Sequence, residues 1–212
     1  IIQTDNQGLA RACNNGIRES TGEYILTLDA DDRIASTYME KAVAVLDADA
    51  NVGIVYCEAE FFGDRTGKWE LQEYRFPNIL LGNMIFDAGF FRRADWQRVN
   101  GYNPNMKNGL QDHDFWLSLI DLGRTVYRIP ETLFYYRQHS GSMINSFTRE
   151  KLIALRTQLF DNHPALYSAN MRYVFEHMLD LYDQVVYFQT RAEELQQKLN
   201  SLDATPDNQK GP

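Results

Sequence analysis

The first part of the chain shows two patterns of apolar residues, one typical of helices and one typical of buried strands. Over residues 7–20 they fall three and four positions apart, which predicts a helix with one buried face. The run 24–28 is short, apolar and bounded by Gly and Asp, as is typical of a buried strand in a mostly parallel sheet. A helix over 36–50 that buries Met39 and a strand at 54–56 repeat this rhythm, which indicates an α/β fold.

The pattern is less regular after residue 60. Aromatic residues and turn formers crowd the stretch 61–84 without a clear period, so no element is predicted there. The remaining patterns predict a strand near 84–91, a helix at 94–99, a buried helix at 112–122, and strands at 126–129 and 133–137 around Pro130. Together these elements indicate one α/β domain that ends near residue 146.

Helical patterns replace the α/β rhythm beyond residue 147, with a break expected at His163-Pro164. In the last helix, apolar residues are spaced alternately four and three apart, as in a coiled coil: Val174, Met178, Leu181, Val185, Phe188, Ala192, Leu195 and Leu199. This heptad seam fits pairing with a second copy of the chain, which we favour, or a hairpin with the preceding helix. We therefore predict a domain at 1–146, a helical extension at 147–203 and a disordered tail at 204–212.

Composition and charge exclude several classes of function. The chain of 212 residues has 44% hydrophobic and 24% charged residues, as globular domains do, and a formal net charge of -8. That acidic balance, with no basic cluster, excludes a protein that binds nucleic acid. The two cysteines match no zinc spacing, and no apolar run approaches the roughly 18 to 20 residues of a membrane span. We expect a cytoplasmic location, with peripheral attachment to the inner face of the membrane left open.

Three aspartates follow the first predicted strand. In an extended backbone Asp29 and Asp31 point to one face, whereas Asp32 points away. Ligands of open α/β sheets bind outside the carboxyl ends of the strands, so these oxygens are placed to hold Mg²⁺ or Mn²⁺ together with a substrate diphosphate. The alternative is that the aspartates only end the strand and cap a turn.

Two blocks of residues that include these aspartates resemble glycosyltransferase family 2. The first block is Asn6-Gln7-Gly8, Ala10-Arg11, Asn14-Asn15-Gly16-Ile17, Gly22-Glu23-Tyr24-Ile25 and Leu28-Asp29-Ala30-Asp31-Asp32. The second is Phe91-Arg92-Arg93, Gly101-Tyr102, Gly109-Leu110-Gln111-Asp112-His113-Asp114-Phe115-Trp116, Gly123, Ile129-Pro130 and Tyr136-Arg137-Gln138-His139. The blocks follow the order and spacing of the family and span residues 1–145.

The resemblance implies a fold and a set of site residues. The fold expected is GT-A-like, a mixed sheet flanked by helices, with an all-α extension after it. Asp112 matches the general base of such enzymes, and Gln111 stands on the acceptor side where the family usually has Glu. The other roles implied are contact with the nucleotide sugar for Asp29, Asp31 and Arg137, and metal binding for Asp31, Asp32 and His139. Each could instead be structural: Asp112 as a helix cap, Arg137 in a salt bridge and His139 in an ordinary hydrogen bond.

The reaction implied is transfer of a sugar, with inversion, from a nucleoside diphosphate sugar to a hydroxyl. We expect a UDP-sugar as donor, a glycan or a lipid-linked acceptor, Mn²⁺ or Mg²⁺ as cofactor, and a role in cell-envelope or surface polysaccharide. Alternatives are a nucleotidyltransferase, or a non-catalytic assembly module with a degenerate transferase domain, which Gln111 and the heptads favour. The family begins with strands that hold the nucleotide base. Because Ile1 follows none of these, we expect a piece of a longer enzyme, inactive alone and weak in donor binding.

Overall fold

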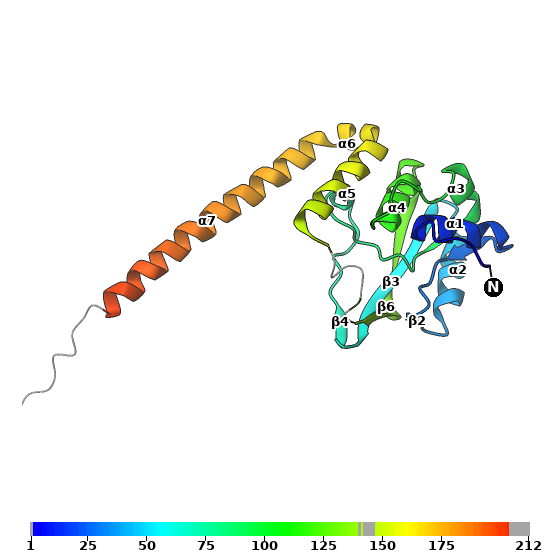
Figure 1. The fold of residues 1–212 in the computed structure, drawn as a ribbon, viewed down its shortest axis with the longest axis horizontal. Helices are drawn as coiled ribbons and strands as arrows, with labels where there is room; N and C mark the ends of the chain where they lie inside the picture. The colour runs from blue at the N-terminus through cyan, green and yellow to red at the C-terminus, as the bar shows by residue number, and fades with distance from the viewer. Residues whose placement is uncertain (1, 140, 142–146, 204–212) are drawn as a thin grey trace, which may run out of the picture. The chain divides into compact units, whose positions relative to one another are not determined.

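The structure, a computed structural model, describes residues 2–139, 141 and 147–203 (Figure 1). The chain divides into two compact units, Ile1–Ser168 and Ala169–Pro212. The first unit holds a six-stranded sheet and most of the helices, which confirms the α/β expectation, and the second holds one long helix. The domain boundary at 146/147 stays a prediction, and the predicted tail at 204–212 lies outside the described residues.

The sheet is mixed. Its strands are β1 (Tyr24–Leu26), β2 (Arg33–Ile34), β3 (Val52–Gly63), β4 (Gly67–Trp69), β5 (Phe90–Arg92) and β6 (Thr125–Gln138). They lie in the order β1-β5-β3-β6-β2, with β4 paired to β3. Among the described strands only β3 and β6 pair in parallel, so the expectation of a mostly parallel sheet was wrong. The expected strand over 84–91 also begins later, at Phe90, which leaves the preceding segment free to line the site described below.

Strand β6 joins the two strands that were predicted around Pro130. Cys57 of β3 pairs with Ile129, but the next residue, Glu58, pairs with Thr132. The two intervening residues bulge out of the ladder, so the missing N–H of Pro130 interrupts no pairing. The strand therefore continues through the proline and carries residues 133–138 to the edge of the site.

The helices of the first unit are α1 (Leu9–Glu19), α2 (Tyr38–Ala48), α3 (Arg93–Arg98), α4 (Gln111–Asp121), α5 (Arg149–Asn162) and α6 (Pro164–Ala169), with a 3₁₀ turn at Asn78–Leu80. Helix α2 buries Tyr38, Ala42 and Leu46, whereas Met39 is 56% exposed. The prediction that Met39 lies on the buried face was wrong, because the buried face of α2 begins with the preceding residue, Tyr38. The break expected at His163-Pro164 is present, and α6 begins at the proline.

Helix α4 is fixed in the core by aromatic contacts. The Phe115 ring lies 4.8 Å from that of Phe91 on β5 and 4.3 Å from that of Tyr102, and Trp116 is completely buried. These contacts confirm that Trp116 and the aromatics near residue 90 belong to the core rather than to a sugar platform. The start of α4, where Gln111 and Asp112 stand, is therefore rigidly positioned.

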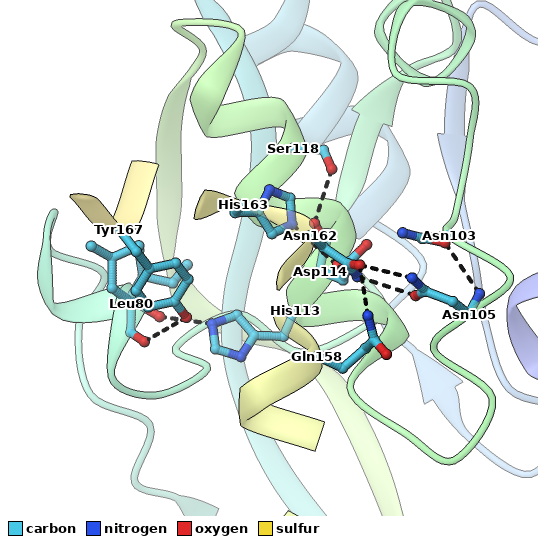
Figure 2. A network of polar contacts seen from close by, with 11 residues as sticks. Leu80, Asn103, Asn105, His113, Asp114, Ser118, Gln158, Asn162, His163 and Tyr167 are labelled. Carbon is cyan, nitrogen blue, oxygen red and sulfur yellow. Dashed lines mark hydrogen bonds and ion pairs between the residues drawn. The ribbon is translucent and has the colours of Figure 1, made fainter. Parts of the chain in front are cut away.

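A polar network joins α4 to the helices that follow (Figure 2). The buried Asp114 carboxylate accepts hydrogen bonds from Asn162 Nδ2 at the end of α5 and from His163 Nε2 at 3.1 Å. Asn162 also pairs with Asn105, and the Tyr167 hydroxyl of α6 donates to the Leu80 carbonyl. The end of α5 is thereby bonded to α4, the helix that carries the predicted base, and α6 is bonded to the 3₁₀ turn at Asn78–Leu80.

The second unit contains α7 (Met171–Asp203), the helix drawn in orange and red in Figure 1. Its extent agrees with the helix expected from the heptad pattern. Within the described chain, no helix is both long enough and apolar enough to cross a membrane.

Candidate functional site

The aspartates at 29–32 stand in a turn rather than at the end of an extended strand. Strand β1 ends at Leu26, and the Asp32 N–H donates to the Asp29 carbonyl at 3.1 Å. The expectation that strand alternation aligns Asp29 with Asp31 was therefore wrong. The turn leaves Asp31 exposed and Asp29 partly buried, so the two carboxylates face different surroundings.

Asp29 and Asp112 nevertheless line one pocket of about 310 Å³, although 83 residues separate them. Thr27 Oγ1 donates to the Asp87 carbonyl at 2.9 Å, which holds the loop after β1 against the segment before β5. Helix α4 begins beside that segment, because Asn83 Nδ2 donates to Asp112 Oδ2 at 2.7 Å. Acidic groups from the two distant blocks of sequence thus converge on one cavity, as the proposed chemistry requires.

Asp112 occupies the first turn of α4 and has the electrostatics of a general base. Burial raises its pKa to about 6, while the backbone N–H of His113 and the Asn83 amide pull it down. Asp29 adds to the rise through charge repulsion. The N-cap residue of α4, Leu110, makes no side-chain cap hydrogen bond, whereas the Asp112 carboxylate accepts from backbone N–H groups of the first turn, so Asp112 can act as a cap as well as a base. Gln111 is buried beside it and lines the same pocket.

Asp87 is a site residue that the sequence patterns did not single out. Its side chain lines the 310 Å³ pocket and also a neighbouring cavity of about 470 Å³ between α1 and β1, and Asp29 lines both as well. Burial raises the pKa of Asp87 well above its usual value, and the charges of Asp112, Asp29 and Asp32 raise it further. The sequence did contain one indication of this role, because Asp87 is the single acidic residue in the apolar run 84–91. Burying a carboxylate is costly, so an acidic residue among core residues is a candidate for a functional site.

Asp31 and His139 come together at the rim of the site. Their Oδ2 and Nε2 atoms lie 3.5 Å apart, and both side chains are about half exposed, 49% and 45%. Asp32 is held differently, because its Oδ1 accepts the Arg137 N–H at 2.8 Å and its Oδ2 is buried without a hydrogen-bond partner. Burial raises the Asp32 pKa to about 6.

These donors fit a divalent ion only in part. Among the described residues no group of three or more His, Cys, Asp or Glu side chains is arranged to hold a metal. The exposed Asp31 carboxylate and the neighbouring His139 imidazole nonetheless suit Mn²⁺ or Mg²⁺, which commonly take one or two protein carboxylates and complete their shell with phosphate oxygens and water. The residues therefore supply part of the ligand set of such an ion, and a bound diphosphate would have to supply much of the rest.

Arg137 fastens the loop at 29–32 to the end of β6. Besides its backbone bond to Asp32, its Nε donates to the Asp31 carbonyl at 3.0 Å. Its guanidinium lies 4.7 Å from the centre of the Phe62 ring, which Arg33 also covers. Arg137 thus makes hydrogen bonds and a cation–π contact in place of the salt bridge considered as the alternative. Its contact with a nucleotide sugar stays a prediction.

An aromatic wall completes the pocket that holds Asp112. Trp69 of β4 stacks on Phe61 with ring centres 5.0 Å apart, and it approaches Tyr136 at 5.1 Å. Trp69, Phe86 and Tyr136 all line the cavity. Trp69 comes from the stretch 61–84 that gave no periodic pattern, because the order of that stretch depends on the pairing of β4 with β3 and not on local propensity.

Comparison with known proteins agrees with this geometry. Residues 1–105 match the family model described as Glycosyl transferase family 2. An uncharacterized glycosyltransferase of Haemophilus influenzae is 32% identical over 149 residues, which cover 66% of this chain and 50% of that protein. The match to the family model includes the aspartates at 29–32 but ends before Gln111. The roles of Gln111, Asp112, Arg137 and His139 are therefore argued from their positions in the structure.

Solved structures show the same fold at low identity. S. aureus TarS in complex with UDP-GlcNAc has a TM-score of 0.53 and 15% identity, over 73% of this chain and 48% of that one. The mannosyltransferase PcManGT of Pyrobaculum calidifontis, solved with GDP-Man and Mn²⁺, has a TM-score of 0.50 and 18% identity, over 81% and 57%. These neighbours support the GT-A-like fold.

The chain spans 50 to 61% of the length of the first curated relatives that it matches. Those relatives are glycosyltransferases by name, and both sequence blocks enclose the carboxylate-lined pocket. Fold, site and sequence similarity therefore agree: the chain belongs to glycosyltransferase family 2.

Proposed function

We propose that this chain forms the catalytic region of an enzyme that transfers a sugar, with inversion, from a nucleoside diphosphate sugar to a hydroxyl. The observation that carries the proposal is the placement of Asp29 and Asp112 in one pocket, with the pKa of Asp112 raised to about 6. Membership of the family supports the reaction class. Single displacement with inversion follows from the presence of one base on the acceptor side.

Asp112 takes the proton of the acceptor hydroxyl as its oxygen attacks the anomeric carbon. A carboxyl with a pKa of about 6 is ionised at neutral pH and is a stronger base than an ordinary aspartate. Such a group contributes roughly 10² to 10⁴-fold to the rate. The Asn83 amide holds Asp112 Oδ2 in place and so fixes the orientation of the carboxylate toward the pocket.

The donor would lie along the loop at 29–32, in contact with Asp29, Asp31 and Arg137; of these three residues, Asp29 lines the 470 Å³ cavity. Asp31 and His139, with the free oxygen of Asp32, would hold Mn²⁺ or Mg²⁺. The ion, when bound, neutralises charge on the departing diphosphate. A UDP-sugar is the favoured donor because TarS was solved with UDP-GlcNAc. PcManGT was solved with GDP-Man, so a GDP-sugar is the alternative donor.

The acceptor lies beside Gln111 and the aromatic wall. Trp69 and Tyr136 offer flat apolar faces on which a sugar ring packs, while the Gln111 amide offers hydrogen bonds. A glycan, free or lipid-linked, suits such a surface. Relatives such as the amylovoran biosynthesis glycosyltransferase AmsE of Erwinia amylovora support a role in polysaccharide synthesis. This role would place the enzyme in the cytoplasm, at the inner face of the membrane.

The test is release of product from a panel of sugar nucleotides by the intact protein, with Mn²⁺ present. We expect a nucleoside diphosphate, and we expect Asp112→Asn to lower turnover at least 100-fold. Asp121→Asn, at the exposed end of the same helix, is the matched control and should leave turnover unchanged. Release of pyrophosphate would identify a nucleotidyltransferase instead, and unchanged turnover in Asp112→Asn would remove the base assignment.

A further inference from the structure

Helix α7 carries two apolar seams, not one. Seam A is the heptad series Val174, Met178, Leu181, Val185, Phe188, Ala192, Leu195 and Leu199. Seam B is a shorter series with the same alternating spacing of four and three: Phe175, Leu179, Tyr182 and Val186. Each seam B residue directly follows a seam A residue, so seam B lies roughly 100° around the helix from seam A. Along 174–188 the two seams together make about half of the helix circumference apolar.

We propose that α7 assembles three or more copies of this chain, with each helix contacting one neighbour through seam A and another through seam B. The inference concerns α7 alone and does not depend on the proposed catalytic function.

The exposed apolar surface of α7 is too large for a free helix. Every residue from 178 to 200 is exposed, and the large apolar side chains are between 42% and 65% exposed. With roughly 100 Å² for each of these side chains, one copy presents on the order of 1,000 Å² of apolar surface. A soluble monomer rarely shows a patch above about 300–600 Å², and a stable complex buries about 800 Å² per partner. This surface therefore has the size of an interface.

The angle between the seams sets the number of partners. A two-stranded coiled coil covers positions a and d and the flanking e and g positions. If seam A occupies a and d, seam B occupies e and b, and the b positions Leu179 and Val186 lie outside the reach of a single partner. They are 63% and 42% exposed. A second neighbour is needed to cover them, which a bundle of three or more helices provides.

The charge of α7 argues against a lipid surface as the occupant. The helix has three basic residues, Arg172, Arg191 and Lys198, against six acidic ones, Glu176, Asp180, Asp183, Glu193, Glu194 and Asp203. Helices that lie on membranes carry Lys and Arg on their polar face, because the cytoplasmic leaflet is anionic. Association with other copies of α7 does not require an excess of Lys and Arg on the polar face.

The mass of the full 212-residue chain in solution tests the proposal. Sedimentation velocity and light scattering between 2 and about 50 µM should give at least three times the 24.6 kDa chain mass. A monomer or a dimer at the highest concentration would overturn the proposal. Cosedimentation of a monomer with vesicles of phosphatidylglycerol would identify a membrane surface as the occupant, and a compact monomer would indicate that α7 folds onto its own chain.

Single substitutions separate the two seams. Leu181→Glu in seam A should give monomers, because seam B is too short to hold copies alone. Leu179→Glu in seam B should reduce the assembly to a dimer held by seam A. Tyr187→Glu is the matched control: Tyr187 is 64% exposed but lies outside both seams, so the wild-type mass should persist. An unchanged mass in Leu179→Glu would overturn the role of seam B, with circular dichroism confirming that each variant folds.

Discussion

Asp112→Asn should stabilise the fold at pH 8 while it abolishes transfer. The Asp112 carboxyl has a pKa of about 6 in the folded protein, against 3.8 as the ordinary value expected after unfolding. Burial is the main cause, so ionised Asp112 is a cost of the native state rather than a contribution to it. Asparagine has nearly the same shape and still accepts the hydrogen bond from Asn83. The variant therefore keeps the geometry and removes the buried charge.

The size and the pH dependence of the effect follow from the two pKa values. Their difference corresponds to about 3 kcal/mol, and partial access of solvent to Asp112 reduces this to on the order of 1–2 kcal/mol. Above pH 6 the carboxyl is ionised in both states, so the whole cost is present. Below about pH 4 it is protonated in both states and the cost vanishes. The stability gain of Asp112→Asn should thus be complete at pH 8 and fade as the pH falls from 6 to 4.

Urea denaturation at pH 8 and at pH 4.5 measures the gain. Asp121→Asn, which removes an exposed carboxylate from the same helix, should change the free energy of unfolding by less than about 0.5 kcal/mol at either pH. Asp95→Asn gives the opposite contrast: Asp95 is buried and pairs with Arg124 at 2.7 Å, so this variant should lose on the order of 3 kcal/mol at pH 8. Destabilisation by Asp112→Asn at pH 8, or an equal gain at both pH values, would refute the reasoning.

Three further predictions concern the fold and the cofactor. Gly101→Ala should lose on the order of 3 kcal/mol in urea denaturation, because φ is +79° and the added Cβ would lie 2.4 Å from Asn14 Oδ1; Gly82→Ala, with open space, should change little. Asn162→Ala should cost about 1–3 kcal/mol, since it removes a donor from the buried Asp114 carboxylate, and a smaller loss in thermal unfolding would show that water replaces it. Chelation should abolish transfer reversibly, with Mn²⁺ restoring the rate, while the melting temperature stays unchanged; transfer that persists in a chelator would exclude the metal.

The periodic elements could be predicted from sequence because their buried faces are local. Helix α4 buries a run of residues on its own helical spacing, so the pattern alone places it. The pattern also predicts that α1 is a helix, although its buried residues include the polar Asn14. Strand direction could not be predicted in this way. Whether β1 pairs in parallel or antiparallel is decided by its neighbour β5, which lies more than 60 residues further along the chain.

The site could be predicted in its residue types but not in its geometry. Motif spacing singled out Asp31 and Asp112, and the structure places Asp112 at a pocket and Asp31 beside His139. Asp87 lies inside a predicted strand and Trp69 in a stretch without a periodic pattern, and neither belongs to a motif, so neither was singled out. Their positions depend on tertiary pairing, of Thr27 with the Asp87 carbonyl and of β4 with β3, which no window of neighbouring residues contains.

The crowding of carboxylates itself argues for a site that works with positive charge. Asp29, Asp87 and Asp112 line one pocket, and burial raises the pKa of all three. The charges of Asp112 and Asp29 raise the pKa of Asp87 further, and that of Asp29 raises the pKa of Asp112, which costs stability in the free protein. Among the described residues that line this pocket there is no Lys or Arg to offset that cost, and the guanidinium of Arg137 is turned onto Phe62. A cation that enters with a diphosphate and the positive charge that develops at an anomeric carbon would both be stabilised there, and only during turnover. Neutralising any one of the three aspartates should therefore stabilise the free protein and slow the reaction together, a pairing that a purely structural role would not produce.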